Sequence, residues 1–112
     1  MAPRDAFASY CAELLSGLGD VRVKRMFGGH GLYVDDLFVA IVAFDTLYLK
    51  ADAQTTPRFE AAGCAPFTYS AKGGRRVSLG YRAAPPEAMD SPALMRPWLE
   101  LAIQAALRSR GR

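Results

Sequence analysis

The first part of the chain alternates apolar and polar residues with the spacing of a helix. Apolar side chains recur three or four positions apart across Phe7–Leu18, as they do on one face of an α-helix. Pro3 suits the first turn of a helix, and Gly17 or Gly19 suits its end. The pattern therefore predicts an amphipathic helix over residues 3–17.

Short apolar segments with turn residues between them follow this helix. The segments with strand-like patterns are Val21–Met26, Leu32–Val34, Leu37–Phe44 and Leu47–Lys50. The glycine-rich run Gly28–Gly31 interrupts the first alternation, whereas Asp35-Asp36 and Asp45-Thr46 separate the later segments. Aspartate tolerates the positive φ of tight hairpin turns. The pattern predicts hairpins, with the almost wholly apolar Leu37–Phe44 central in the sheet or covered on both faces.

The second half of the chain changes between helical and strand-like patterns. It predicts a short helix at residues 56–62, strands at 67–71 and 77–81, and a final helical segment at 91–108. Gly73-Gly74 is a strong hairpin signal between the two strands. Pro97 lies inside the last segment, which favours a short turn and a helix restarting near Pro97 over a kinked helix. Trp98 is placed on the inner face of this helix.

These elements predict an α+β fold with two layers. Tight turns between consecutive strands require mainly antiparallel pairing. The sheet is expected to have five or six strands, with the helices packed on one face, in the order α-β-β-β-(β)-α-β-β-α. A chain of 112 residues fits a single domain over residues 1–112.

Composition and charge narrow the class of protein. The chain is 51% hydrophobic and 22% charged, with a formal net charge of +3, which excludes a disordered or fibrous chain. The charge is −2 over residues 1–60 and +5 over residues 61–112. The longest apolar run is too short to span a bilayer. Two cysteines without a CxxC spacing, and no signal-like N-terminus, predict a cytoplasmic protein with reduced thiols and no membrane partner.

Candidate chemistry is sparse. His30 is the only histidine, and a loop between its flanking glycines could expose it as a base or ligand. No Ser/His/Asp pattern or metal-ligand spacing accompanies it. The aspartates are interpreted as turn formers, Cys11 as core, and Cys64 as a thiol with no histidine nearby in sequence. The sequence therefore predicts no enzyme activity, no catalytic residue, no metal and no cofactor.

The basic residues of the second half are more informative. The candidate surface for an anion, a nucleic acid or a partner consists of Lys72, Arg75, Arg76 and Arg82, around and beyond the Gly73-Gly74 turn. A second cluster is Arg108, Arg110 and Arg112. Arginine suits bidentate contact with phosphate or carboxylate. The alternative interpretation is a solvated hairpin tip and a frayed terminus.

Several segments together resemble the N-terminal domain of the TfoX/Sxy proteins, bacterial regulators of competence for DNA uptake. The segments that carry the resemblance are Arg25–Tyr33, Phe38–Ala40, Leu47–Asp52, Phe59–Gly63, Pro66–Tyr69 and Trp98-Leu99. The resemblance implies a two-layer α+β fold and no catalytic residues. Within its motif, Met26 and Phe27 are expected in the core, and Gly28 and Gly29 are expected to be backbone requirements. The family's regulators carry a further C-terminal domain, so this chain is expected to be a stand-alone version.

The resemblance implies a small non-enzymatic regulatory or adaptor domain that contacts a protein of the transcription machinery, such as a transcription factor or a polymerase component. One alternative is weak, sequence-nonspecific DNA binding through the basic hairpin. A second alternative is small-molecule binding or catalysis near His30. The sequence also leaves open a homodimer through an exposed edge strand or through the helix that carries Trp98.

Overall fold

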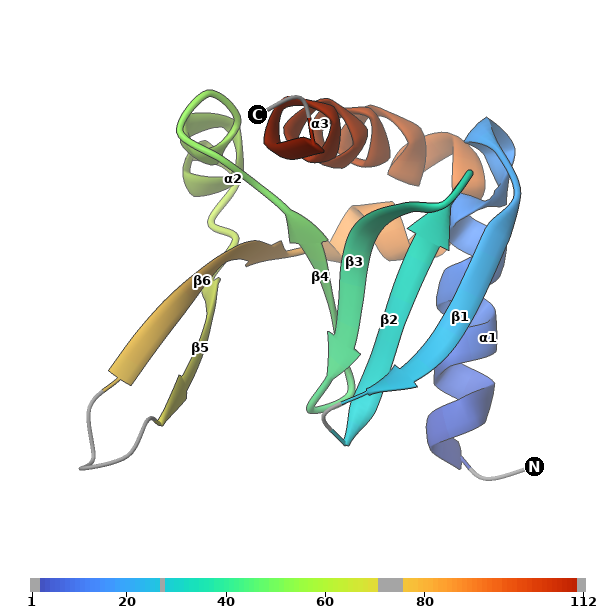
Figure 1. Cartoon of the computed structure of the whole chain (residues 1–112). Coiled ribbons are helices and arrows are strands. Elements are labelled where there is room, and N and C mark those ends of the chain that lie inside the picture. Colours follow the sequence, from blue (N-terminus) through green and yellow to red (C-terminus); the bar gives the residue numbers. More distant parts are fainter. Residues whose placement is uncertain (1–2, 27, 71–75, 111–112) are drawn as a thin grey trace.

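The computed structural model describes residues 3–26, 28–70 and 76–110, which form three α-helices and one six-stranded sheet (Figure 1). The helices are α1 (Pro3–Leu15), α2 (Thr56–Ala61) and α3 (Pro92–Arg110). The strands are β1 (Val21–Met26), β2 (Gly29–Val34), β3 (Leu37–Ala43), β4 (Thr46–Lys50), β5 (Pro66–Ser70) and β6 (Arg76–Ala83). Two 3-10 turns precede β1 and α3, at Ser16–Leu18 and Pro86–Asp90. The predicted α+β class and element order are confirmed.

The sheet is entirely antiparallel and has the strand order β1-β2-β3-β4-β6-β5. β1 to β4 form a meander, and then α2 and β5 intervene before β6 returns to pair with β4. This order places β1 and β5 at the two edges. In Figure 1 the β5–β6 hairpin extends away from the other strands, toward the lower left.

The main core lies between the helices and one face of the sheet. Its most buried large side chains include Leu15, Leu32, Leu49, Phe59 and Leu99, none more than 1% exposed. Trp98 packs against this core, with its ring centroid 5.3 Å from that of Phe59. Its predicted place on the inner face of α3 is therefore confirmed. No helix in the described part of the chain is both long and apolar enough to cross a membrane.

The β2–β3 and β3–β4 hairpins use the same kind of two-residue turn. Asp35 and Asp36 have φ of 48° and 66°, as predicted for the first turn. In the second, the turn residues are Phe44 and Asp45, with φ of 53° and 56°. The expected strand Leu37–Phe44 thus ends one residue early, because the last pair of the ladder is Ala43 with Thr46.

Two sequence-based expectations are wrong. His30 does not lie in an exposed loop, because β2 begins at Gly29 and His30 pairs with Val42 of β3. A Cβ atom at Gly29 would lie 2.1 Å from the carbonyl oxygen of Val42, so glycine here allows the close approach of two strands.

The second correction concerns Pro97, which lies within a continuous α3 rather than at a helix start. A proline at this position leaves only the carbonyl of Ala93 without its helical donor. Both residues are exposed, so that carbonyl faces water, and burial of Met95 and Leu99 on the opposite side keeps the helix intact.

Candidate functional site

Of the four residues in the predicted basic surface, the structure describes the side chain of Arg82 alone, and this side chain forms hydrogen bonds within the chain. Lys72 and Arg75 lie outside the described residues, and Arg76 begins β6 with its side chain outside the description as well. The guanidinium of Arg82 donates hydrogen bonds to the carbonyl oxygen of Cys64 and to the carboxylate of Glu60, each at 3.0 Å. With its side chain 17% exposed, Arg82 joins β6 to α2 through Glu60 and to the α2–β5 connection through Cys64. It is therefore not an open cation.

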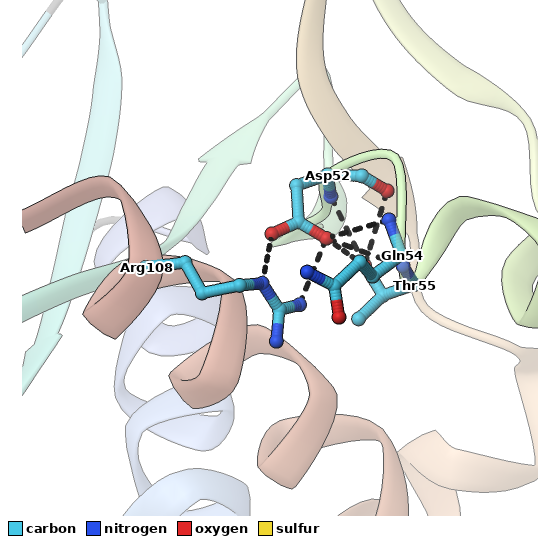
Figure 2. A network of polar contacts seen from close by, with 4 residues as sticks. All are labelled: Asp52, Gln54, Thr55 and Arg108. Atoms are coloured by element: carbon cyan, nitrogen blue, oxygen red, sulfur yellow. Dashed lines mark hydrogen bonds and ion pairs between the residues drawn. The ribbon is translucent and has the colours of Figure 1, made fainter. Parts of the chain in front are cut away.

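A second arginine of the predicted basic clusters also forms an ion pair within the chain. Arg108 lies near the end of α3 and donates two hydrogen bonds to the carboxylate of Asp52 (Figure 2). Its Nε lies 2.6 Å from Oδ2, and its Nη2 lies 2.9 Å from Oδ1. The two residues are 56 positions apart in the sequence. Such bidentate pairs are the strong form of ion pair. No local sequence signal predicts this contact, because Asp52 has the pattern of a turn former and Arg108 belongs to a terminal cluster of basic residues.

The loop around Asp52 holds the carboxylate in place for this pair. Asp52 Oδ1 accepts hydrogen bonds from the amides of Gln54 and Thr55, at 3.1 and 3.2 Å. The Thr55 hydroxyl in turn accepts one from the Asp52 amide at 3.0 Å (Figure 2). Hydrogen bonding to Arg108 is the main cause that lowers the pKa of Asp52 to about 2. The same pair raises the pKa of Arg108.

His30 lies at a hollow formed where α1, β2 and the β3–β4 turn meet. The hollow has a volume of about 380 Å³ and is lined by Phe7, Gly28, Gly29, His30, Val42, Ala43, Phe44 and Asp45. His30 is 6% exposed, so its ring is part of the wall. His30 and Asp45 thus both contribute to the lining of this hollow, together with apolar residues of α1 and β3. No group of three His, Cys, Asp or Glu side chains placed to hold a metal occurs in the described part of the chain.

The rest of the Met26–Gly29 motif surrounds the same turn. Met26 ends β1 and is half-buried, whereas Phe27 lies outside the described residues. Gly28 has a φ of +76°, in the left-handed region that glycine occupies at low cost. The expectation that these glycines meet backbone requirements is thus supported at Gly28 by its conformation and at Gly29 by its close contact.

The two thiols are poorly placed for nucleophilic chemistry. Both cysteines are free and buried. Burial raises the pKa of Cys11 to about 12, and it also raises the pKa of Cys64. A thiol reacts as its thiolate, so near neutral pH both groups stay in their unreactive protonated form.

The sheet face opposite the main core carries a row of aromatic and basic side chains. The Arg22 guanidinium lies over the Tyr33 ring at 5.6 Å, and Tyr33 stacks on Phe38 with 5.0 Å between ring centroids. Phe38 packs against Tyr81 at 6.0 Å, and the Lys50 ammonium lies 5.1 Å from the centre of the Tyr81 ring. We call these five residues the aromatic row. It was not predicted, because its members come from five different strands.

A second apolar cluster accompanies the aromatic row on this face. Ile41, Phe67 and Tyr81 are its buried members, with Phe38, Ala43 and Tyr48 packed against them. All six belong to strands, so among the described residues this cluster contains no helical side chain. The helices thus pack on one face of the sheet, whereas the other face carries aromatic rings that are buried or half-buried among strand residues.

These features define a small α+β domain with helices over one face of an antiparallel sheet and an aromatic row on the other. The family model of the TfoX N-terminal domain matches residues 13–106. The chain therefore belongs to the TfoX N-terminal domain family, and the resemblance found in the sequence is confirmed.

Two relatives show how much of a longer protein this chain corresponds to. It is 29% identical over 103 residues to the DNA transformation protein TfoX of Haemophilus influenzae, covering 91% of this chain and 48% of that protein. It is 34% identical over 55 residues to the DNA transformation protein TfoX1 of Aliivibrio fischeri, covering 49% of this chain and 26% of that protein. The chain thus spans about half the length, or less, of these relatives.

Proposed function

We propose that this chain is a non-enzymatic regulatory or adaptor domain that acts in competence for DNA uptake. It does so by contact with a protein of the transcription machinery. The observation that carries this proposal is the match to the TfoX N-terminal domain over residues 13–106, together with relatives named DNA transformation proteins. These relatives are about twice as long as this chain, so the proposal concerns what one domain contributes.

The aromatic row supports a protein partner. Interfaces are enriched in aromatic residues and arginine, which supply large contact areas at low entropic cost. Tyr33, Phe38 and Tyr48 are half-buried on the face that the described helices leave uncovered. Among the described residues, the Lys50 ammonium makes no ion pair, and Arg22 pairs only with the exposed Asp36, at 2.9 Å. A fitting partner therefore offers apolar side chains to the rings and carboxylates to the two flanking cations.

The first test is capture of partners by the purified chain from a bacterial lysate treated with nuclease, so that nucleic acid cannot bridge two proteins. We expect a transcription factor or a polymerase component to be retained, and retention to fall sharply for Arg22→Glu. The Arg22–Asp36 pair is exposed and contributes little to folding. Arg58→Glu, an equal charge change at an exposed position of α2, serves as the matched control. Recovery of neither class of protein would count against the proposal.

The second test asks whether the domain acts in competence. The matching half of Haemophilus influenzae TfoX is replaced by this chain, and the frequency of transformation is measured in a strain without its own copy. We expect the chimera to restore transformation and its Arg22→Glu version to fail at equal protein abundance. A chimera that is abundant and folded but inactive would argue against a shared role.

A further inference from the structure

Phe44 is a residue that the fold itself does not require. It occupies the first position of the β3–β4 turn with a φ of 53°, where glycine, asparagine or aspartate is favoured. Its side chain is 76% exposed, so burial does not compensate for the unfavourable backbone. Among the described residues its ring contact is with Phe67, at 6.3 Å between centroids. Positions where a residue violates a local rule without structural compensation are typical of functional sites.

The hollow beside Phe44 can hold a ring of the same kind. Its volume of about 380 Å³, which includes space open to solvent, leaves room for a ring, since an enclosed cavity of roughly 150 Å³ already holds benzene. Phe7, Val42 and Ala43 contribute apolar walls, and Phe44 itself forms part of the rim. An exposed ring and a hollow wide enough for a ring therefore adjoin at one turn.

We propose that the occupant of the hollow is Phe44 of a second copy of this chain. A twofold axis beside the β3–β4 turn brings each ring to the other copy's hollow, so one contact satisfies both features at once. Contacts of this self-complementary kind form closed dimers. This inference does not rest on the proposed function, because the turn lies outside the aromatic row.

The size of the contact predicts a weak dimer. Aromatic side chains bury about 150–250 Å² each, so two rings and the hollow walls remain below the ~1,200 Å² of a standard stable interface. Such contacts form and separate readily and are populated only in concentrated protein. The single inserted ring then acts as the anchor on which most of the affinity depends.

The test is sedimentation velocity of the full chain over a concentration series extending to about 1 mM, the range in which weak contacts dissociate. We expect a monomer–dimer equilibrium whose dissociation constant rises at least about tenfold in Phe44→Asn. Asparagine tolerates positive φ, so this variant is expected to unfold at the same or higher denaturant concentration than the wild type. Leu107→Gln removes an equally large apolar side chain that is 51% exposed on α3 and is expected to leave the dimer unchanged.

Amide NMR spectra recorded on dilution locate the contact. We expect concentration-dependent shifts at Phe7, Val42 and Asp45, around the hollow, and none at Leu107. A wild type that stays monomeric throughout the series would overturn the proposal. So would a dimer that Phe44→Asn leaves intact, or a Phe44-dependent contact made only with another protein.

Discussion

The bond between Asp52 and Arg108 makes a pH-dependent contribution to stability that one substitution can isolate. Asp52→Asn keeps the shape of the side chain and an oxygen that accepts the Gln54 and Thr55 amide bonds, but it removes the negative charge. The pKa of Asp52 falls from its ordinary value of 3.8 to about 2. That difference of about 1.8 units corresponds to at most ~2.4 kcal/mol. Because the carboxylate is 30% exposed, solvent screening reduces the expected effect to about 1 kcal/mol.

The direction of the pH dependence follows from the lowered pKa. A carboxyl group whose pKa is lower in the folded state stabilises the protein fully above its unfolded pKa. This stabilisation is lost as the pH falls through the folded pKa. The free energy of unfolding of the wild type is therefore expected to exceed that of Asp52→Asn by about 1 kcal/mol at pH 7. The difference should begin to shrink near pH 4, and most of it should be lost by pH 2.

Urea unfolding of both proteins between pH 2 and pH 7 measures this difference. All other carboxylates are common to the two chains, so their titration cancels in the subtraction. Arg108→Gln is the companion variant, and NMR titration is expected to show the pKa of Asp52 returning toward 3.8 when the guanidinium is removed. A difference in stability that stays constant over the whole pH range would refute the reasoning. So would an ordinary pKa for Asp52 in the wild type.

Three further predictions follow from packing and burial. Gly29→Ala is expected to destabilise the fold by at least about 2 kcal/mol in chemical unfolding, because the new Cβ would lie 2.1 Å from the Val42 carbonyl oxygen. Gly17→Ala is the control, and its stability should be close to that of the wild type because no atom lies within 4 Å of its Cβ. Pro97→Ala is expected to raise the melting temperature by supplying the missing helical amide, a gain of about 1 kcal/mol or more, and an unchanged or lower melting temperature would contradict this account of α3. Cys11 is expected to resist a thiol reagent in the folded chain and to react once urea unfolds the protein, since its side chain is 0% exposed and its pKa is about 12. Rapid modification of Cys11 in the native protein would contradict this prediction.

The elements of this fold follow from local patterns that the sequence displays directly. The helical spacing of Phe7–Leu18, the paired aspartates Asp35 and Asp36, and the alternation of the later strands each predict an observed element. Periodicity works here because a helix or strand must present its apolar face to the core. Boundaries were less accurate where two effects compete. Phe44 continues an apolar run yet lies in a turn, because the β3–β4 ladder closes at the pair Ala43 and Thr46. Pro97 disfavours a helix yet lies within one, because Met95 and Leu99 of the same helix are buried.

The roles of the candidate functional residues were harder to predict, since the sequence around a charged side chain does not show which residue it pairs with. Arg82 and Arg108 were both expected on open basic surfaces, yet Glu60 and Asp52 bind them within the chain. His30 was expected in a loop and instead lines a hollow as part of β2. An arginine at the surface and an arginine in an ion pair have the same local sequence signal, and only the approach of a distant carboxylate distinguishes them.

By itself, the sequence determined the class of fold, the hairpins that join β2, β3 and β4, and the core face of the long helices. Its motifs also determined membership of the TfoX N-terminal domain family, whereas the predicted Gly73-Gly74 turn lies outside the described residues. Tertiary structure alone decided that β6 returns to pair with β4, and so assembled the aromatic row from five strands. It also placed Asp52 against Arg108 and left Phe44 beside an open hollow. The physical reason is that hydrophobic periodicity acts over a few residues, whereas ion pairs, ring contacts and cavities depend on how distant segments pack together.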